Sequence, residues 1–494
     1  MAFHLNISHL NHLKNLAGQT VIYGLSTIVS RFLNYLLTPF YTYIFVPSAF
    51  ADVTVLYAYV TFLNIILTYG METGLFFFAK QENRSLVYGT AFISILATTS
   101  LFVIFSLYFL KDIASLIGYQ HHARYVFWFV LILGFDSLAA IPFANLRQQN
   151  KAFRFALLKL LNVLITIFIN VILIWVIPHF FVKDHQLFGF KYHVSVELIF
   201  IANCLGSLIT FLILIPDLIK EKLKFNMGLW KRMVNYSYPL LFAGLIGTIN
   251  ETLDRILLQN YLPKNVDFMA QIGIYGACVR VAMLMAIFTQ MFRFAAEPYI
   301  FNRQKSEDQK TILADSTKYF FLFGMVIFLG VISYLGLIQY FIGPKYREGL
   351  KIVSVYMLGS LGLGVYFNLS FWYKLNGKTY FGILITAFGA LLTILINIFF
   401  IPQYGYVASA WARLICYVTI VLISYFLGQH YYPIKYPIAN MMKYLILGLI
   451  LFWMATHFNS HHLVLNLVKN SIIFGGFIYY LERKEKLLSL FIKK

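Results

Sequence analysis

Residues 18–45, GQTVIYGLSTIVSRFLNYLLTPFYTYIF, contain a single charged residue, Arg31, and are long enough to cross a lipid bilayer. Similar apolar runs fill the chain from Leu16 to Tyr480, and most lysines and arginines lie in the short gaps between them. Only 12% of the 494 residues are charged and 60% are hydrophobic. A soluble domain carries about 25% charged residues. The sequence therefore predicts an integral membrane protein.

Counting about 20 apolar residues per helix predicts an all-α fold with about fourteen transmembrane helices. The predicted spans are 16–45, 51–78, 86–110, 124–145, 155–177, 194–215, 237–262, 272–300, 315–338, 349–372, 380–400, 407–427, 437–457 and 463–481.

The formal net charge of +20 is explained by the distribution of basic residues among the loops. When the loops are assigned alternately to the two sides, one set contains most of the lysines and arginines, including the C-terminal tail. The positive-inside rule places that set, and with it both termini, in the cytoplasm. No loop is long enough to form a nucleic-acid-binding domain, so we expect no nucleic-acid partner. Membrane lipids are the expected surroundings.

The order of the spans predicts two halves. Residues 1–216 form a first lobe of six helices, a basic cytoplasmic linker covers 217–236, a second six-helix lobe covers 237–428, and residues 429–494 add two helices and a basic tail. A weak internal repeat supports this division. The first span ends in SRFLNYLLTPFYT and the seventh in LDRILLQNYLP, and both place an arginine ahead of Asn, Tyr and Pro.

Four segments carry a more specific resemblance: GQTVIYGLSTIVSRFLNYLLTPFYTYIF, INETLDRILLQNYLP, FRFAAEPYIFNRQ and IPQYGYVASAWARL. With them, the chain resembles Wzx-type oligosaccharide flippases, the polysaccharide biosynthesis proteins of the multidrug/oligosaccharidyl-lipid/polysaccharide exporter superfamily. The resemblance implies two pseudo-symmetric lobes around a central cavity in the cell inner (cytoplasmic) membrane. It further implies alternating-access transport of a lipid-linked oligosaccharide for O-antigen, capsule or exopolysaccharide synthesis, in association with polysaccharide polymerase machinery.

Such a cargo carries an anionic diphosphate, for which arginine is the best-matched counter-ion. Arg31, Arg255 and Arg280 are our candidate substrate-binding residues because they stand within apolar spans. Each has a structural alternative. Arg31 could pair with an acid on another span, and Arg255 could pair with Glu251, four residues earlier.

Four acids within the spans, Glu72, Asp136, Glu251 and Asp254, are our candidates for ion coupling or gating. A carboxylate in an apolar environment can load and release a proton, although each acid could instead be the partner of an intramembrane arginine. Arg293 and Glu297, again four residues apart, are interpreted as a structural or gating pair. We predict no metal site and no cofactor beyond an ion or proton gradient.

Motifs for nucleotide binding, zinc proteolysis and serine hydrolysis are missing from the sequence, so we do not expect an enzyme. A membrane polymerase or glycosyltransferase would require a large external loop, which the sequence lacks. Two transporter alternatives remain open. One is an ion-coupled multidrug exporter of the same superfamily, and the other is a flippase for the peptidoglycan lipid precursor.

Overall fold

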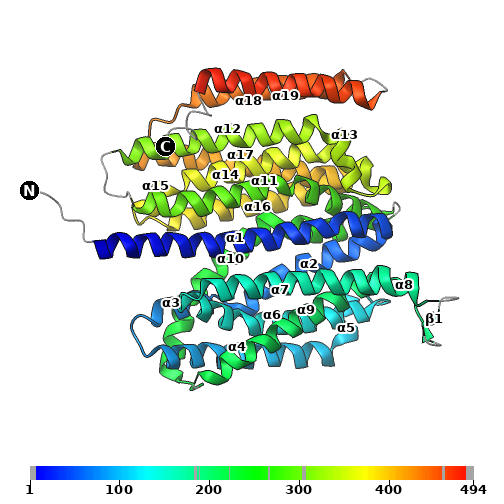
Figure 1. Ribbon diagram of the computed structural model, residues 1–494, viewed down its shortest axis with the longest axis vertical. Helices are drawn as coiled ribbons and strands as arrows, with labels where there is room; N and C mark the ends of the chain where they lie inside the picture. Colours follow the sequence, from blue (N-terminus) through cyan, green and yellow to red (C-terminus); the bar gives the residue numbers. More distant parts are fainter. Residues whose placement is uncertain are drawn as a thin grey trace, which may run out of the picture. The chain divides into compact units, whose positions relative to one another are not determined.

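The computed structural model describes residues 7–182, 186–187, 190–221, 223–264, 267–302, 308–458 and 462–485, and helices dominate this part of the chain (Figure 1). Within it, twelve helical segments are long and apolar enough to cross a membrane. The protein is therefore an all-helical, multi-pass membrane protein. Residues 486–494 of the predicted basic tail lie outside the described residues.

The prediction of fourteen spans is not confirmed. Two of the predicted spans, 16–45 and 237–262, fall in α1 (Ile7–Ile44) and α10 (Met227–Tyr261), which are not among the twelve. Both helices are long enough to cross a bilayer. They are also interrupted by polar and charged residues, Arg31 in α1 and the cluster from Glu251 to Arg255 in α10, which lower their hydropathy.

Contacts divide the chain into two compact units. Unit 1 contains Met1–Leu37 and Ala49–Ile256, and unit 2 contains Thr38–Ser48 and Leu257–Lys494. Both α1 and α10 contribute to both units, because each is divided near its C-terminal end. The two lobes with two extra helices, as the sequence divides them, remain a prediction.

In unit 1, α6 is the central helix, since it packs against α3, α4, α5, α7 and α9, while α7 also packs against α9. Buried side chains of α6, α7 and α9, including Phe143, Phe155 and Leu214, form a core cluster. Besides parts of α1 and α10, the unit contains α2 (Pro47–Thr68), α3 (Met71–Phe78), α4 (Arg84–Tyr108), α5 (Leu110–Leu116), α6 (Ala123–Gln148), α7 (Ala152–Val171), η1 (Ile172–Val176), α8 (Ile177–Phe180), β1 (Gln186–Leu187), β2 (Phe190–Lys191) and α9 (Glu197–Lys220).

Unit 2 repeats this packing with different helices. Its central helix, α14, packs against α11, α12 and α17, and α16 packs against α17. The two last helices, α18 and α19, pack against α12. The elements of unit 2 are α11 (Phe268–Asn302), α12 (Gln309–Ser333), α13 (Leu335–Ile338), η2 (Gln339–Phe341), η3 (Pro344–Ile352), α14 (Val353–Leu369), α15 (Phe371–Leu375), α16 (Tyr380–Tyr404), α17 (Tyr406–Tyr431), α18 (Ile438–His457) and α19 (Leu463–Glu485).

The predicted span 51–78 is interrupted between α2 and α3. Tyr69 and Gly70 adopt φ angles of 30° and 74°, so the helix breaks there and restarts at Met71. A side chain on Gly70 would meet the main-chain oxygen of Ser237 at 2.9 Å. This position therefore favours glycine for both its φ angle and its close approach to α10.

The chain between α9 and α10 is short and packs against α4. The amide of Asn226 donates to Thr90 Oγ1 at 3.2 Å, and the indole of Trp230 donates to Ser94 Oγ at 2.5 Å. Gly89 makes this approach possible, because a Cβ there would lie 2.6 Å from both the main-chain N and O of Lys224. The segment that joins the two helices is thus fixed on α4.

We expect Gly89→Ala to destabilise the protein by about 1–3 kcal/mol, because the new methyl group forces main-chain atoms apart. The measurement is thermal unfolding of the purified protein in detergent. Gly475→Ala in α19 is the matched control, since no atom lies within 4 Å of the position of its added Cβ. Equal stability of the two variants would contradict the close approach of residue 224 to α4.

Candidate functional site

Arg31 lies on α1, in the part of that helix that belongs to unit 1, and its side chain is exposed. Glu251 on α10 is close enough to interact with it electrostatically, and its side chain is also exposed. Within the described residues, Arg31 forms no ion pair or hydrogen bond with another side chain. The structure thus brings together two predicted site residues from distant parts of the sequence, and the guanidinium group can still bind a ligand.

Arg255, also in unit 1, is held by its own helix. Its Nη1 donates to the main-chain oxygen of Glu251 at 3.2 Å, and it forms an ion pair with Asp254 at 3.7 Å. Asp254 is only 6% exposed and accepts a hydrogen bond from the Arg255 amide at 2.9 Å. These contacts make Arg255 less accessible to a ligand than Arg31.

Arg280, the third predicted arginine, lies on α11 in unit 2. Its Nη1 lies 3.5 Å from Oγ1 of Thr38, at the end of α1 that belongs to the same unit, and Tyr41 is a further neighbour. The predicted arginines are therefore divided between the units, with Arg31 and Arg255 in unit 1.

Glu72 forms a cross-helix ion pair. It lies in the first turn of α3, directly after the break at Gly70, and its carboxylate accepts a hydrogen bond from Arg147 at the end of α6. The guanidinium of Arg147 also lies over the rings of Phe76 and Phe155, at 5.3 and 5.7 Å. The sequence assigned Arg147 to a loop and so did not identify this partner.

Asp136 is matched by Lys159, a residue that the sequence analysis missed. Asp136 on α6 lies within electrostatic range of Lys159 on α7 and beside the hydroxyl of Ser207 on α9. The ammonium group of Lys159 stacks over the Phe143 ring at 4.3 Å. A detectable signal was present, because Lys159 interrupts the predicted span 155–177 in the run FALLKLLNV.

A second missed group lies in unit 2. Lys318 of α12 forms an ion pair with Glu485 of α19, and the Tyr444 hydroxyl of α18 donates to the same carboxylate at 2.7 Å. Three helices meet at this carboxylate. Its role is to fix α18 and α19 to α12, since all three partners are partly or fully buried.

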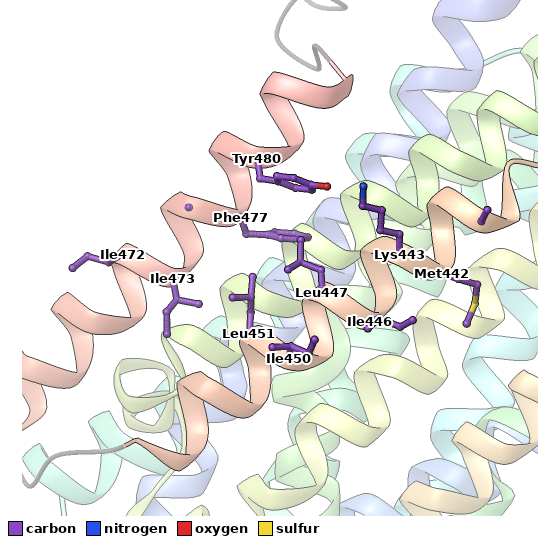
Figure 2. Close-up of a pocket in the computed structure, with 12 residues that line it drawn as sticks. Met442, Lys443, Ile446, Leu447, Ile450, Leu451, Ile472, Ile473, Phe477 and Tyr480 are labelled. Atoms are coloured by element: carbon purple, nitrogen blue, oxygen red, sulfur yellow. The ribbon is translucent and has the colours of Figure 1, made fainter.

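The helices α18 and α19 enclose an apolar groove of about 770 Å³ (Figure 2). Figure 2 shows Lys443 and Tyr480 facing each other at one end, where the ammonium group lies 5.7 Å from the ring centroid. The remaining lining residues are Ala439, Met442, Ile446, Leu447, Ile450, Leu451, Ile472, Ile473, Gly476 and Phe477. The groove thus combines an aliphatic floor with a cation at its end.

In the part of the chain that the structure describes, no group of three His, Cys, Asp or Glu residues could hold a metal ion. The three cysteines, Cys204, Cys278 and Cys416, are buried and form no disulfide with one another.

Comparison with known families decides the membership of the chain. Residues 16–304, more than half of the chain, match the family described as "Polysaccharide biosynthesis protein". The chain belongs to this family. A search of curated proteins gives no significant match.

Solved structures show the same fold. "Lipid II flippase MurJ, inward closed conformation" is similar with a TM-score of 0.75 at 18% identity, over 94% of this chain and 99% of that one. An inward-facing multidrug resistance MATE family transporter of the MOP superfamily gives a TM-score of 0.62 at 12% identity, over 86% and 99%. A crystal structure of MATE in complex with MaD3S gives 0.59 at 13%, over 87% and 97%. At these identities the likeness establishes the fold.

We expect Arg31→Cys to react readily with a charged, water-soluble thiol reagent, and Asp254→Cys to react much more slowly. The exposed face of Arg31 must contact water for this result, because a charged reagent does not reach acyl chains. Mass spectrometry of the purified protein measures the labelling, and the buried native cysteines give a low background.

Equal rates for the two positions would contradict the burial of Asp254. An unreactive Arg31→Cys would place this side chain in lipid and remove it from the candidate site.

Proposed function

We propose that this member of the polysaccharide biosynthesis family is a flippase for a polyprenyl-diphosphate-linked oligosaccharide. It moves the headgroup from the cytoplasmic to the outer leaflet of the inner membrane by alternating access, for O-antigen, capsule or exopolysaccharide synthesis. In this proposal both termini are cytoplasmic, and the polymerase machinery receives the cargo. The observation that supports it most is Arg31, a cation on a helix with a long apolar stretch that forms no ion pair within the described residues.

The argument from Arg31 is electrostatic. A charge at the centre of a bilayer costs about 2.5–3.5 kcal/mol even on insertion scales, so it persists where it faces a polar cavity or a counter-ion. Glu251 attracts Arg31 without forming an ion pair with it. A diphosphate can therefore bind Arg31 without first breaking a closed ion pair, and the planar guanidinium matches phosphate oxygens.

Arg280 and Arg255 complete the proposed substrate site. With Arg31, they are the arginines that we propose to bind the substrate. Nη1 of Arg280 lies 3.5 Å from the hydroxyl oxygen of Thr38. Arg255 shares its charge with Asp254 and contributes least.

The groove between α18 and α19 suits the prenyl chain of the proposed cargo. Its aliphatic lining and volume of about 770 Å³ fit part of a prenyl chain, which remains in an apolar environment while the headgroup crosses. Lys443, at the end of the groove, provides a positive charge for the phosphate side of such a lipid.

A flippase for the peptidoglycan lipid precursor is the second candidate, because the lipid II flippase MurJ shares the fold over 94% of this chain. That cargo has the same lipid diphosphate and a different glycan. Competition between the two glycan classes for transport separates these candidates. The ion-coupled multidrug exporter is a further candidate, which the MATE-like fold keeps open.

We expect Arg31→Ala to lower translocation of lipid-linked oligosaccharide by about tenfold or more, since it loses a charge-assisted contact with the diphosphate. Reconstituted vesicles and a membrane-impermeant sugar-modifying enzyme measure the exposed headgroup. Arg31→Lys should retain part of the activity. The control is Arg232→Ala, whose guanidinium pairs with Glu82 on an exposed surface. Translocation by Arg31→Ala at the wild-type rate would remove the proposed site.

We also propose that Glu251 links Arg31 to an ion gradient, and that Glu72, Asp136 and Asp254 are secondary candidates because each lies beside a cation in unit 1. Protonation of Glu251 would remove the negative charge nearest Arg31. Glu251→Gln should therefore weaken the dependence of transport on a pH gradient. Glu197→Gln is the control, as Glu197 accepts a hydrogen bond from Trp128 Nε1 at 2.9 Å. An unchanged gradient dependence would count against Glu251.

A further inference from the structure

Each unit contains an ion pair between a glutamate and a basic residue of another helix. Glu72 and Glu297 each lie twelve residues ahead of the next long helix, which begins at Arg84 in unit 1 and at Gln309 in unit 2. Their partners are each the next-to-last residue of a helix, Arg147 in α6 and Lys374 in α15. In unit 1 the pair joins α3 to the end of α6, and in unit 2 it joins α11 to the end of α15.

The pair in unit 2 differs by one positive charge. Oε1 of Glu297 lies 3.2 Å from Nε of Arg293 and 3.3 Å from Nζ of Lys374, so two cations converge on a single carboxylate oxygen. In unit 1 the charges around Glu72 balance, because Arg147 pairs with Glu72 and the nearby Lys159 is matched by Asp136. Glu297 is the one acid among the described residues that line the adjoining pocket.

Aromatic rings hold both cations in place. The Arg293 guanidinium lies 5.1 Å from the centroid of the Phe367 ring, and the Lys374 ammonium lies 5.2 Å from that of Phe371. The adjoining pocket has a cavity volume of only about 10 Å³, enough for one water molecule, and is otherwise lined by Thr289, Phe292, Ala296, Gly364 and Asn368. A ligand oxygen can therefore enter this place only by displacing the Glu297 carboxylate. A cation over a ring face loses little freedom when a ligand binds.

We propose that Arg293 and Lys374 form a binding site for a phosphate or diphosphate group, in which a ligand oxygen replaces Oε1 of Glu297. Arg293 uses its Nε for Glu297, and its two Nη groups donate no hydrogen bond to the described residues, so they can hold a second ligand oxygen. Glu297 competes with the ligand and keeps the two cations paired in its absence.

The apolar side of the pocket favours a lipid phosphate over a free one. Phe292, Phe367 and Phe371 lie beside the cations, so the surroundings of a bound phosphate are apolar. The site would then take the proposed cargo at a place separate from Arg31. This assignment of the ligand rests on the proposed function, while the anion site itself rests on the geometry.

Calorimetry on the full chain in detergent tests the site, with inorganic pyrophosphate and farnesyl diphosphate as the probes. We expect Glu297→Gln to bind both probes roughly fivefold more tightly, because the competing carboxylate is lost from a partly exposed pair. The double variant Arg293→Gln with Lys374→Gln should bind about tenfold more weakly or worse. Tighter binding of the prenyl probe assigns the site to lipid phosphates, and equal binding assigns it to free ones.

Controls separate this site from the rest of the protein. Glu82→Gln releases Arg232 from an exposed pair of similar geometry and should leave both affinities unchanged. Lys374→Arg keeps the charge and should bind like the wild type, which excludes a folding defect as the cause of lost binding. All titrations are repeated in the Arg31→Ala background, so that a ligand bound near Arg31 does not conceal the result.

The proposal is overturned if Glu297→Gln leaves the affinities unchanged or lowers them, or if the double variant binds like the wild type. Transport is measured separately. Loss of transport in Arg31→Ala with intact pyrophosphate binding supports both sites. Intact transport in Arg31→Ala, together with the expected binding changes at Glu297, removes the proposed function and leaves the anion site.

Discussion

The cost of placing a charge in hydrocarbon constrains the rest of this structure. A buried charge is tolerated when a partner of opposite sign lies next to it, and in unit 1 two acids of the spans have such a partner on another helix. Glu72 of α3 uses Arg147 of α6, and Asp136 of α6 uses Lys159 of α7. These pairs also fix which helices pack together, because removing one partner would leave the other charge uncompensated.

Arg31 is informative against this background. It lies on one of the two long helices that are too polar to be counted among the twelve spans, and its nearest acid is on the other, α10. The two helices that combine length with polarity thus carry Arg31 and Glu251, two exposed charges of unit 1. In the flippase that we propose, polar helices of this kind are expected where the hydrophilic headgroup crosses.

The two units use one plan of helix packing with different chemical detail. In both, a central helix, α6 or α14, packs against helices before and after it in the sequence. In both, a glutamate also pairs with a basic residue near the end of a helix, α6 in unit 1 and α15 in unit 2. Only the second unit adds another cation to that acid, through Arg293. A glutamate paired with a basic residue is therefore present in both units, while the side chain of Arg293 adds a positive charge to the group in unit 2.

The sequence alone determined the membrane class, the approximate positions of the spans and the resemblance to polysaccharide biosynthesis proteins, because hydropathy and motifs are read along the chain. It also located Arg31, Glu72 and Asp136 as charges within apolar runs. It did not identify Arg147 or Lys159 as their partners, the break at Gly70, or Lys374 as a partner of Glu297. These depend on which helix lies beside which and on how each helix is rotated about its axis. Residue spacing fixes neighbours within a single helix, and only the tertiary structure decides the neighbours between helices.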